Sequence, residues 1–121
     1  MKAIAHTRAL PITDPASLVD LELPAPVPGP HDLLVKVPAI SVNPVDTKRR
    51  KDAAKTDDKP RVLGWDAAGV VEAVGAQAKL FKPGDEVYYA GDVTRPGANS
   101  ELHCVDERIV GRKPKKLDFA Q

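Results

Sequence analysis

Side chains that could contact a ligand gather in two short stretches of the sequence. Residues 43–48 read Asn-Pro-Val-Asp-Thr-Lys, and residues 64–66 read Gly-Trp-Asp. The amide of Asn43 offers two N–H donors and an acceptor oxygen, and the indole of Trp65 offers a flat apolar surface with one N–H. Asp66 alone supplies one hard oxygen ligand, which is too few for a metal site. These residues can bind and orient a small molecule.

The groups that nucleophilic catalysis needs do not occur at a spacing that lets them act together. His103 and Cys104 are adjacent in an expected strand, so their side chains point to opposite faces and cannot form a nucleophile–base pair. Cys104 is the only cysteine, which excludes an internal disulfide and a zinc site built from several cysteines. We expect it to be a small buried hydrophobic residue. The sequence assigns no catalytic residue.

A glycine-rich turn for binding phosphate is also missing. No Gly-x-Gly-x-x-Gly occurs among the 121 residues. The segment 69–75 begins and ends with glycine, but its spacing is wrong and no helix is expected after it. The chain is therefore not expected to bind a dinucleotide tightly by itself.

The elements that must position these residues are short. Twelve prolines and eight glycines favour strands joined by turns over long helices. Asn43, followed by Pro44 and Asp46, predicts the start of a short helix that ends near Lys51. Pro38 is expected at an edge position or a bulge, and segment 51–60 is expected to be a surface loop. Strands are predicted at residues 2–10, 18–23, 32–42, 67–75, 86–90, 100–105 and 108–110.

Composition and charge narrow the class of partner. Eighteen Lys and Arg against 17 Asp and Glu leave a formal net charge of +1, which gives no general field for nucleic acid or an anionic membrane. No apolar run is long enough to span a membrane, and residues 1–8 lack the apolar core of a signal peptide. We expect a cytoplasmic protein with neither a nucleic-acid nor a membrane partner.

Three segments together carry a family resemblance. They resemble the N-terminal domain of the medium-chain dehydrogenase/reductases. The segments are Gly64-Trp65-Asp66-Ala-Ala-Gly with the residues up to Gly75, Lys-Pro-Gly-Asp-Glu-Val at 82–87, and Ser-Val-Asn-Pro-Val-Asp at 41–46. The branch they resemble is the zinc-independent quinone oxidoreductase-like one, often called zinc-type alcohol dehydrogenase-like. The resemblance implies a mainly β fold, a GroES-like β-barrel with a short helix and long loops. It also implies a GroES-like domain at residues 1–112 and, at 113–121, the start of a connection to a cofactor-binding Rossmann domain that is absent from this chain.

The same resemblance implies a function. Such proteins reduce quinones or α,β-unsaturated carbonyls by hydride transfer from NADPH, and commonly pair as homodimers through the domain that is missing here. By resemblance, Asn43, Thr47 and Lys48 are expected to contact the cofactor and Trp65 the substrate. Zinc-dependent members place a Cys and a Gly-His-Glu where this chain has Asn43 and Gly64-Trp65-Asp66, so no zinc is expected. The chain alone is expected to be inactive.

Simpler roles remain open for each of these residues. Asn43 could act only as the helix cap, and Trp65 only as a core residue. Thr47 could bond its own helix backbone, and Lys48 could face solvent. Tyr88 and Tyr89 are adjacent in one strand, so only one can point inward, and the other could border the cleft. The alternative function is a stand-alone barrel that binds a protein partner or itself, through an apolar patch near the C-terminus.

Overall fold

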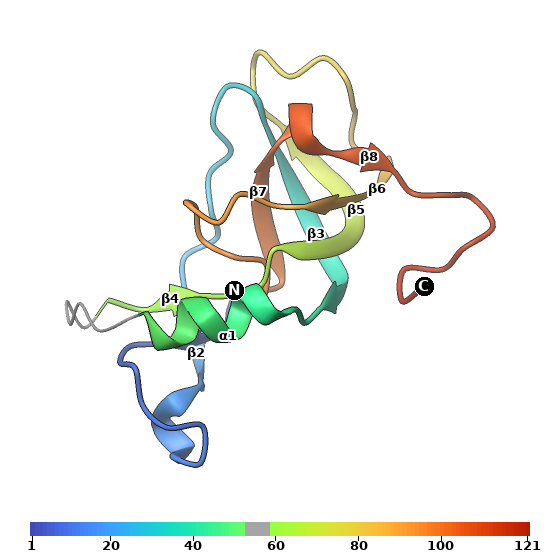
Figure 1. The fold of residues 1–121 in the computed structure, drawn as a ribbon. Coiled ribbons are helices and arrows are strands. Elements are labelled where there is room, and N and C mark those ends of the chain that lie inside the picture. The colour runs from blue at the N-terminus through green and yellow to red at the C-terminus, as the bar shows by residue number, and fades with distance from the viewer. Residues whose placement is uncertain (53–58) are drawn as a thin grey trace.

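Two antiparallel sheets and one α-helix make up the part of the chain that the computed structural model describes, residues 1–52 and 59–121 (Figure 1). The smaller sheet has the strand order β2-β1-β4, and the larger has the order β7-β3-β5-β6-β8. The strands are β1 (Lys2–His6), β2 (Val19–Glu22), β3 (Asp32–Ser41), β4 (Arg61–Val62), β5 (Asp66–Val74), β6 (Glu86–Ala90), β7 (Leu102–Asp106) and β8 (Gly111–Arg112). The helices are α1 (Pro44–Lys51) and two 3₁₀ turns, η1 (Pro15–Ser17) and η2 (Glu107–Ile109). The expected mainly β fold is confirmed.

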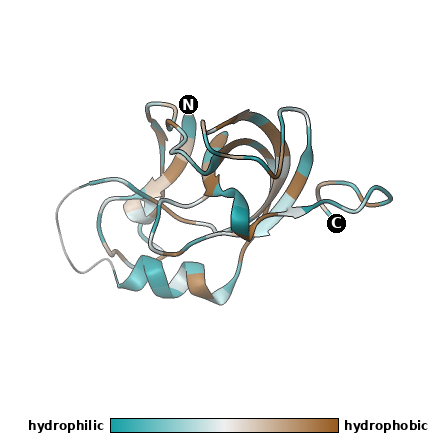
Figure 2. Cartoon of the chain, turned by 90° about the horizontal axis from the view of Figure 1, so that it is seen from above, coloured by the Kyte–Doolittle hydropathy of each residue, from teal (hydrophilic) through white to brown (hydrophobic). Residues whose placement is uncertain are grey.

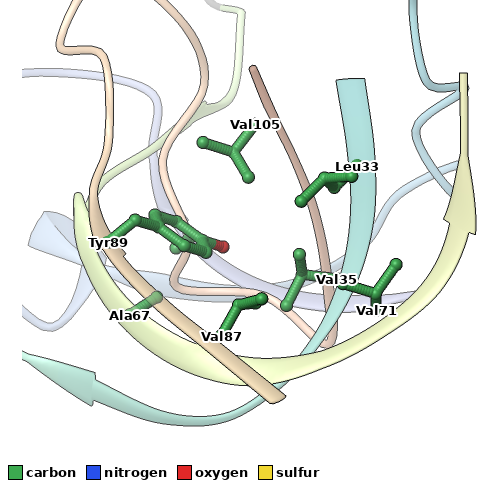
Figure 3. Packing of buried hydrophobic residues seen from close by; sticks show 8 residues of the cluster. Leu33, Val35, Ala67, Val71, Val87, Tyr89 and Val105 are labelled. Atoms are coloured by element: carbon green, nitrogen blue, oxygen red, sulfur yellow. The ribbon is translucent and has the colours of Figure 1, made fainter. Parts of the chain in front are cut away.

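The larger sheet curves around the main hydrophobic core. Figure 3 shows side chains from β3, β5, β6 and β7 pointing toward one another inside the curve. Alternate positions along each strand supply this core, because successive side chains in a strand face opposite sides. Its buried members on the strands are Leu33, Val35, Ala67, Val71, Val87, Tyr89 and Val105, and Ala98 joins them from the loop between β6 and β7. Figure 2 shows apolar residues along the strands of the curved sheet and mostly polar residues on α1.

Pro38 lies at an irregularity in the pairing of β3 with β5, as predicted. The register shifts between Lys36 and Ala39, so the proline, which has no N–H to donate, sits where the ladder is interrupted. Nearby, a Cβ on Gly69 would lie 2.1 Å from the carbonyl oxygen of Lys36. Only glycine therefore allows the two backbones to approach this closely.

Three expectations about local structure were wrong. Residues 108–110 do not form a strand, because the Asp106 carboxylate accepts the N–H of Arg108 (2.9 Å) and starts the 3₁₀ turn η2 instead. The first strand ends at His6 rather than at residue 10. The strand expected from residue 100 begins at Leu102. Most of the loop expected at 51–60 lies outside the described residues.

No helix in the described part of the chain has both the length and the apolar character needed to cross a membrane.

Candidate functional site

Asn43 and Asp66 meet at the end of the β3–β5 ladder. Asn43 follows β3, Asp66 begins β5, and the antiparallel register places Ser41 opposite Asp66. The side-chain nitrogen of Asn43 donates to the Asp66 carboxylate and also lies 3.4 Å from both the carbonyl and the hydroxyl oxygen of Ser41. Two of the stretches singled out in the sequence therefore form one polar cluster.

Asp46 joins the same stretches through the backbone. Its buried carboxylate accepts the N–H of Asn43 (2.6 Å), the reciprocal bond of a capping box, and the N–H of Gly64 (3.1 Å). Gly64 has a φ of +90°, and a Cβ there would lie 2.1 Å from the side-chain oxygen of Asn99. The sequence placed Asp46 at the helix start but did not indicate that it also holds the turn before β5.

Thr47 and Lys48 project from the exposed face of α1. The Thr47 hydroxyl donates to the carbonyl of Pro44 (2.9 Å), which is the backbone role considered for it in the sequence. Lys48 is exposed, and its ammonium bonds none of the described residues. Neither residue lines one of the two cavities described below.

Trp65 is both a packed residue and part of a cavity wall. Its side chain is 5% exposed, and its Nε1–H donates to the carbonyl of Arg95 (3.3 Å). It borders a cavity of about 690 Å³ between segments 23–27, 60–62 and 93–97. Trp65 is therefore a core residue that also borders a cavity, and its contact with a substrate stays a prediction.

An ion pair fixes the position of Arg95, whose carbonyl accepts the N–H of Trp65. The Arg95 guanidinium makes two bonds to the Asp32 carboxylate, of 2.9 and 2.7 Å, and this pairing lowers the pKa of Asp32 below its usual range. Asp32 also accepts the N–H of Gly29 (2.9 Å). Because Asp32 begins β3, the loop between β6 and β7 is fixed to the larger sheet, and with it the carbonyl that Trp65 contacts.

His103 and Cys104 face opposite sides of β7, as predicted. His103 is buried, its Nε2 lies 3.0 Å from the carbonyl of Pro96, and its Nδ1 lies 2.8 Å from the Tyr89 hydroxyl. A carbonyl can only accept, so Nε2 carries the proton and Nδ1 accepts from Tyr89. Burial lowers the pKa of His103. Cys104 is half-buried on the cavity wall rather than buried, and desolvation raises its pKa to about 11, which makes it a poor nucleophile.

A second cavity, of about 580 Å³, lies beside the Asn43–Asp66 cluster. Its lining includes Ser41 and Asp66, the ends of β3 and β6, and the segment 113–121 that leaves the body of the molecule beyond β8 (Figure 1). Tyr89 points into the core and Tyr88 points outward onto this cavity, as the alternation of the strand predicted. Within residues 1–52 and 59–121, no three His, Cys, Asp or Glu side chains are grouped so that they could hold a metal ion.

Known proteins resemble this chain in sequence. Residues 29–115, more than half of the chain, match the alcohol dehydrogenase GroES-like domain. A zinc-type alcohol dehydrogenase-like protein of Staphylococcus epidermidis is 40% identical over all of this chain and 35% of its own length. An NADPH-dependent alkenal/one oxidoreductase of Arabidopsis thaliana is 42% identical over 74% of this chain and 25% of its own length.

Solved structures agree over nearly the whole chain. A putative zinc-dependent alcohol dehydrogenase from Rhizobium etli matches with a TM-score of 0.93 and 59% identity, over 98% of this chain and 34% of its own. The Escherichia coli quinone oxidoreductase complexed with NADPH matches with a TM-score of 0.81 and 28% identity, over 98% and 35%. The chain thus spans about a third of the length of most of these proteins. These matches confirm the resemblance found in the sequence, and the chain belongs to the alcohol dehydrogenase GroES-like domain family.

Proposed function

We propose that this chain is the substrate-side domain of an NADPH-dependent oxidoreductase that reduces quinones or α,β-unsaturated carbonyls. The observation that carries the proposal is the match of 98% of the chain to a quinone oxidoreductase complexed with NADPH. A relative named for alkenal/one reduction with NADPH supports the same substrate class.

The residues at the end of β3 fit the nicotinamide end of such a cofactor. Asn43 is half-exposed and held in place by Asp66 and Asp46, so it can present a fixed amide to a ligand. Thr47 and Lys48 are exposed one turn further along α1 and are the next candidates for contact. When bound, the reduced nicotinamide supplies the hydride; this domain binds and orients its reactive end.

We propose that the reaction does not use zinc. The donors at the place where zinc-dependent members hold the metal are an amide, an indole whose N–H is bonded to Arg95, and one carboxylate that already accepts from Asn43. Such a set lacks the thiolate and imidazole ligands that zinc prefers. Negative charge that develops on the substrate oxygen is then stabilised by hydrogen-bond donors or water. Trp65, in the wall of the first cavity, is the candidate for apolar contact with the substrate.

The test is an assay of the full-length protein with NADPH and a panel of quinones and enals. We expect NADPH oxidation with at least one member, and an about ten-fold lower kcat/KM for Asn43→Ala, which is the effect of one lost hydrogen bond. Lys36→Ala, an exposed change on the larger sheet, is the control and should leave kcat/KM unaltered. Absence of turnover across the panel would contradict the proposal.

The exposed apolar surface at the second cavity favours an alternative, a barrel that binds a protein partner or another copy of itself. Ile40, Tyr88 and Leu117 are each more than 40% exposed there. The native coding sequence beyond Gln121 separates the two functions. A strand, a glycine-rich turn and a helix downstream support the reductase, whereas a stop codon supports the binding module.

Two further parts of the proposal rest on the family resemblance. They are a domain boundary after Arg112 with residues 113–121 as the connection, and pairing of two copies through the cofactor-binding domain. Residence in the cytoplasm stays an expectation from the sequence. The inactivity of this chain alone follows from its lack of a phosphate-binding turn. Purified residues 1–121 should show no NADPH oxidation with substrates that the full-length protein reduces.

A further inference from the structure

We propose that Asp66 is a positioning residue that fixes the carboxamide of Asn43, so that Asn43 presents its oxygen, a hydrogen-bond acceptor, to the bound cofactor. This inference rests on the function proposed above. It adds which partner donates the hydrogen bond. Asn43 accepts it, and the donor is a group on the nicotinamide riboside half of the cofactor.

The first step of the argument is the orientation of the amide. The side-chain nitrogen of Asn43 faces three acceptors, namely the Asp66 carboxylate, the Ser41 carbonyl and the Ser41 hydroxyl. A carboxylate can only accept, so the end of the amide that faces it must be the NH₂. Rotating the amide by 180° would bring its oxygen against that carboxylate and lose a charge-assisted bond. Asp66 therefore selects one of the two orientations.

The second step is that the rest of the residue is also fixed. The N–H of Asn43 donates to Asp46 (2.6 Å), and the carbonyl of Asn43 accepts the N–H of Asp46 (3.0 Å) as α1 begins. Asp66 is itself placed by its pairing with Ser41 in the β3–β5 ladder and with Ala90 in β6. These bonds fix the backbones of both residues, so the side-chain torsions alone remain, and the bond between the two side chains restrains those.

The third step concerns what remains for a ligand. The two N–H groups of the amide are directed toward protein acceptors, and its oxygen faces the N–H of Asp46 in the capping box of α1. A carbonyl oxygen has two lone pairs, so one remains to accept from a ligand. The ligand group must then be a hydroxyl or an N–H. On the nicotinamide riboside half of the cofactor, this is a ribose hydroxyl or the nitrogen of the nicotinamide carboxamide.

The test exchanges the two side chains in the full-length protein and measures NADPH binding through the fluorescence of the bound cofactor. Asn43→Asp alone places two carboxylates in contact, and we expect the Kd for NADPH to rise at least about ten-fold. The double variant N43D/D66N restores one donor and one acceptor and still presents an acceptor at position 43. Its Kd should return to within about three-fold of the unsubstituted protein. A Kd that stays as high as in Asn43→Asp would overturn the inference.

A double-mutant cycle separates positioning from general damage to the fold. Asp66→Ala should raise the Kd about ten-fold in the native background and leave it unchanged in an Asn43→Ala background, because Asp66 acts through Asn43. An equal effect in both backgrounds would contradict the proposal. Glu72→Ala is the matched control, because it removes an exposed carboxylate from the same strand, β5, away from Asn43, and its Kd should stay within about two-fold.

Two ligands identify the donor and keep this test distinct from that of the proposed function. Adenosine 2′,5′-bisphosphate lacks the nicotinamide half, so its affinity should be the same in every variant. A loss of its affinity that parallels the loss for NADPH would overturn the assignment.

The 3-acetylpyridine analogue of NADPH keeps the ribose hydroxyls but has no amide N–H. If Asp66→Ala weakens it as much as NADPH, the donor is a ribose hydroxyl; if not, it is the carboxamide. Failure of the unsubstituted protein to bind NADPH would reject the proposed function itself.

Discussion

At the scale of single residues, some buried polar groups depend on one or two particular partners. His103 is the clearest example, because both ring nitrogens are bonded inside the core and the hydroxyl of Tyr89 reaches only one of them. A buried acceptor that loses its donor costs more than the bond contributed, since water cannot replace the donor. The pair also lies next to the wall of the first cavity, so its packing helps to define that space.

Tyr89→Phe tests this dependence. The change leaves Nδ1 of His103 without a donor, and we expect it to lower the free energy of unfolding by about 2 kcal/mol. Tyr88→Phe is the matched control, because Tyr88 is 50% exposed and its hydroxyl makes no hydrogen bond to a described residue. It should change stability by less than about 0.5 kcal/mol. Equal effects in urea unfolding would show that the bond to His103 contributes nothing.

The two buried histidines predict how stability depends on pH. Burial lowers the pKa of His6 and His103 in the folded protein below the ordinary value of 6.5. The unfolded chain therefore binds more protons, and stability should be full above pH 6.5 and decline as the pH falls below it. The decline is at most about 1.4 kcal/mol per pH unit for each histidine. Urea unfolding at pH 7.5 and 5.5 measures it, and equal stability at both would contradict the prediction.

At the scale of secondary-structure elements, two positions require glycine for different physical reasons. Gly69 in β5 allows the carbonyl of Lys36 to approach closely, although its own φ is ordinary for a strand. Gly84, in the turn before β6, has a φ of +93° but no atom near the place where a Cβ would stand. The first position excludes a side chain by contact and the second by backbone conformation alone.

Alanine at these two positions separates the effects. Gly84→Ala should lower the free energy of unfolding by about 1 kcal/mol, the cost of a left-handed backbone. Gly69→Ala should cost about 3 kcal/mol, because β3 must move away from β5. The difference can be measured by thermal or urea unfolding of the two variants. A Gly69→Ala protein as stable as Gly84→Ala would mean that the two strands can separate freely.

The secondary-structure elements also differ in how well they could be predicted from the sequence. The start of α1 was predictable because its signals, Asn43, Pro44 and Asp46, lie within four residues. The strand expected at 108–110 was wrong because the preceding Asp106 bonds the backbone of Arg108, and this local bond outweighs the strand preference of Ile109 and Val110. The ion pair of Asp32 with Arg95 spans 63 positions and has no local signal.

The candidate site was predictable only in part for the same reason. Asn43 and Trp65 could be singled out by their types and by the family resemblance. The contact of Asn43 with Asp66 depends on the register of β3 against β5, which is set by the bulge at Pro38 and by the close approach at Gly69. A shift of one residue would turn Asp66 to the other face of the sheet.

At the scale of the whole molecule, the chain has one face that suits a larger assembly. The second cavity brings Ile40, Tyr88 and Leu117, all exposed, next to the polar cluster at Asn43. Exposed apolar groups that gather in this way commonly mark a contact surface. We expect the cofactor-binding domain of the proposed full-length protein to cover this face, which is in water when residues 1–121 are alone.

We therefore expect residues 1–121 to self-associate at high concentration. Ile40→Lys and Leu117→Lys together should shift sedimentation toward the monomer by adding charge to this face, with little effect on unfolding because both residues are exposed. Ile12→Lys with Val27→Lys is the matched control, since these residues are exposed but do not line this cavity. Association that the control abolishes equally would place the contact elsewhere.

The single tryptophan gives this molecule an optical reporter of its own. Trp65 is the only indole in the chain, and its N–H is bonded to a carbonyl that the ion pair of Arg95 with Asp32 holds in place. Its emission wavelength is therefore sensitive to any event that wets the first cavity or releases the loop between β6 and β7. Ligand entry, loop release and unfolding can each be followed by the fluorescence of this residue, without attaching a dye.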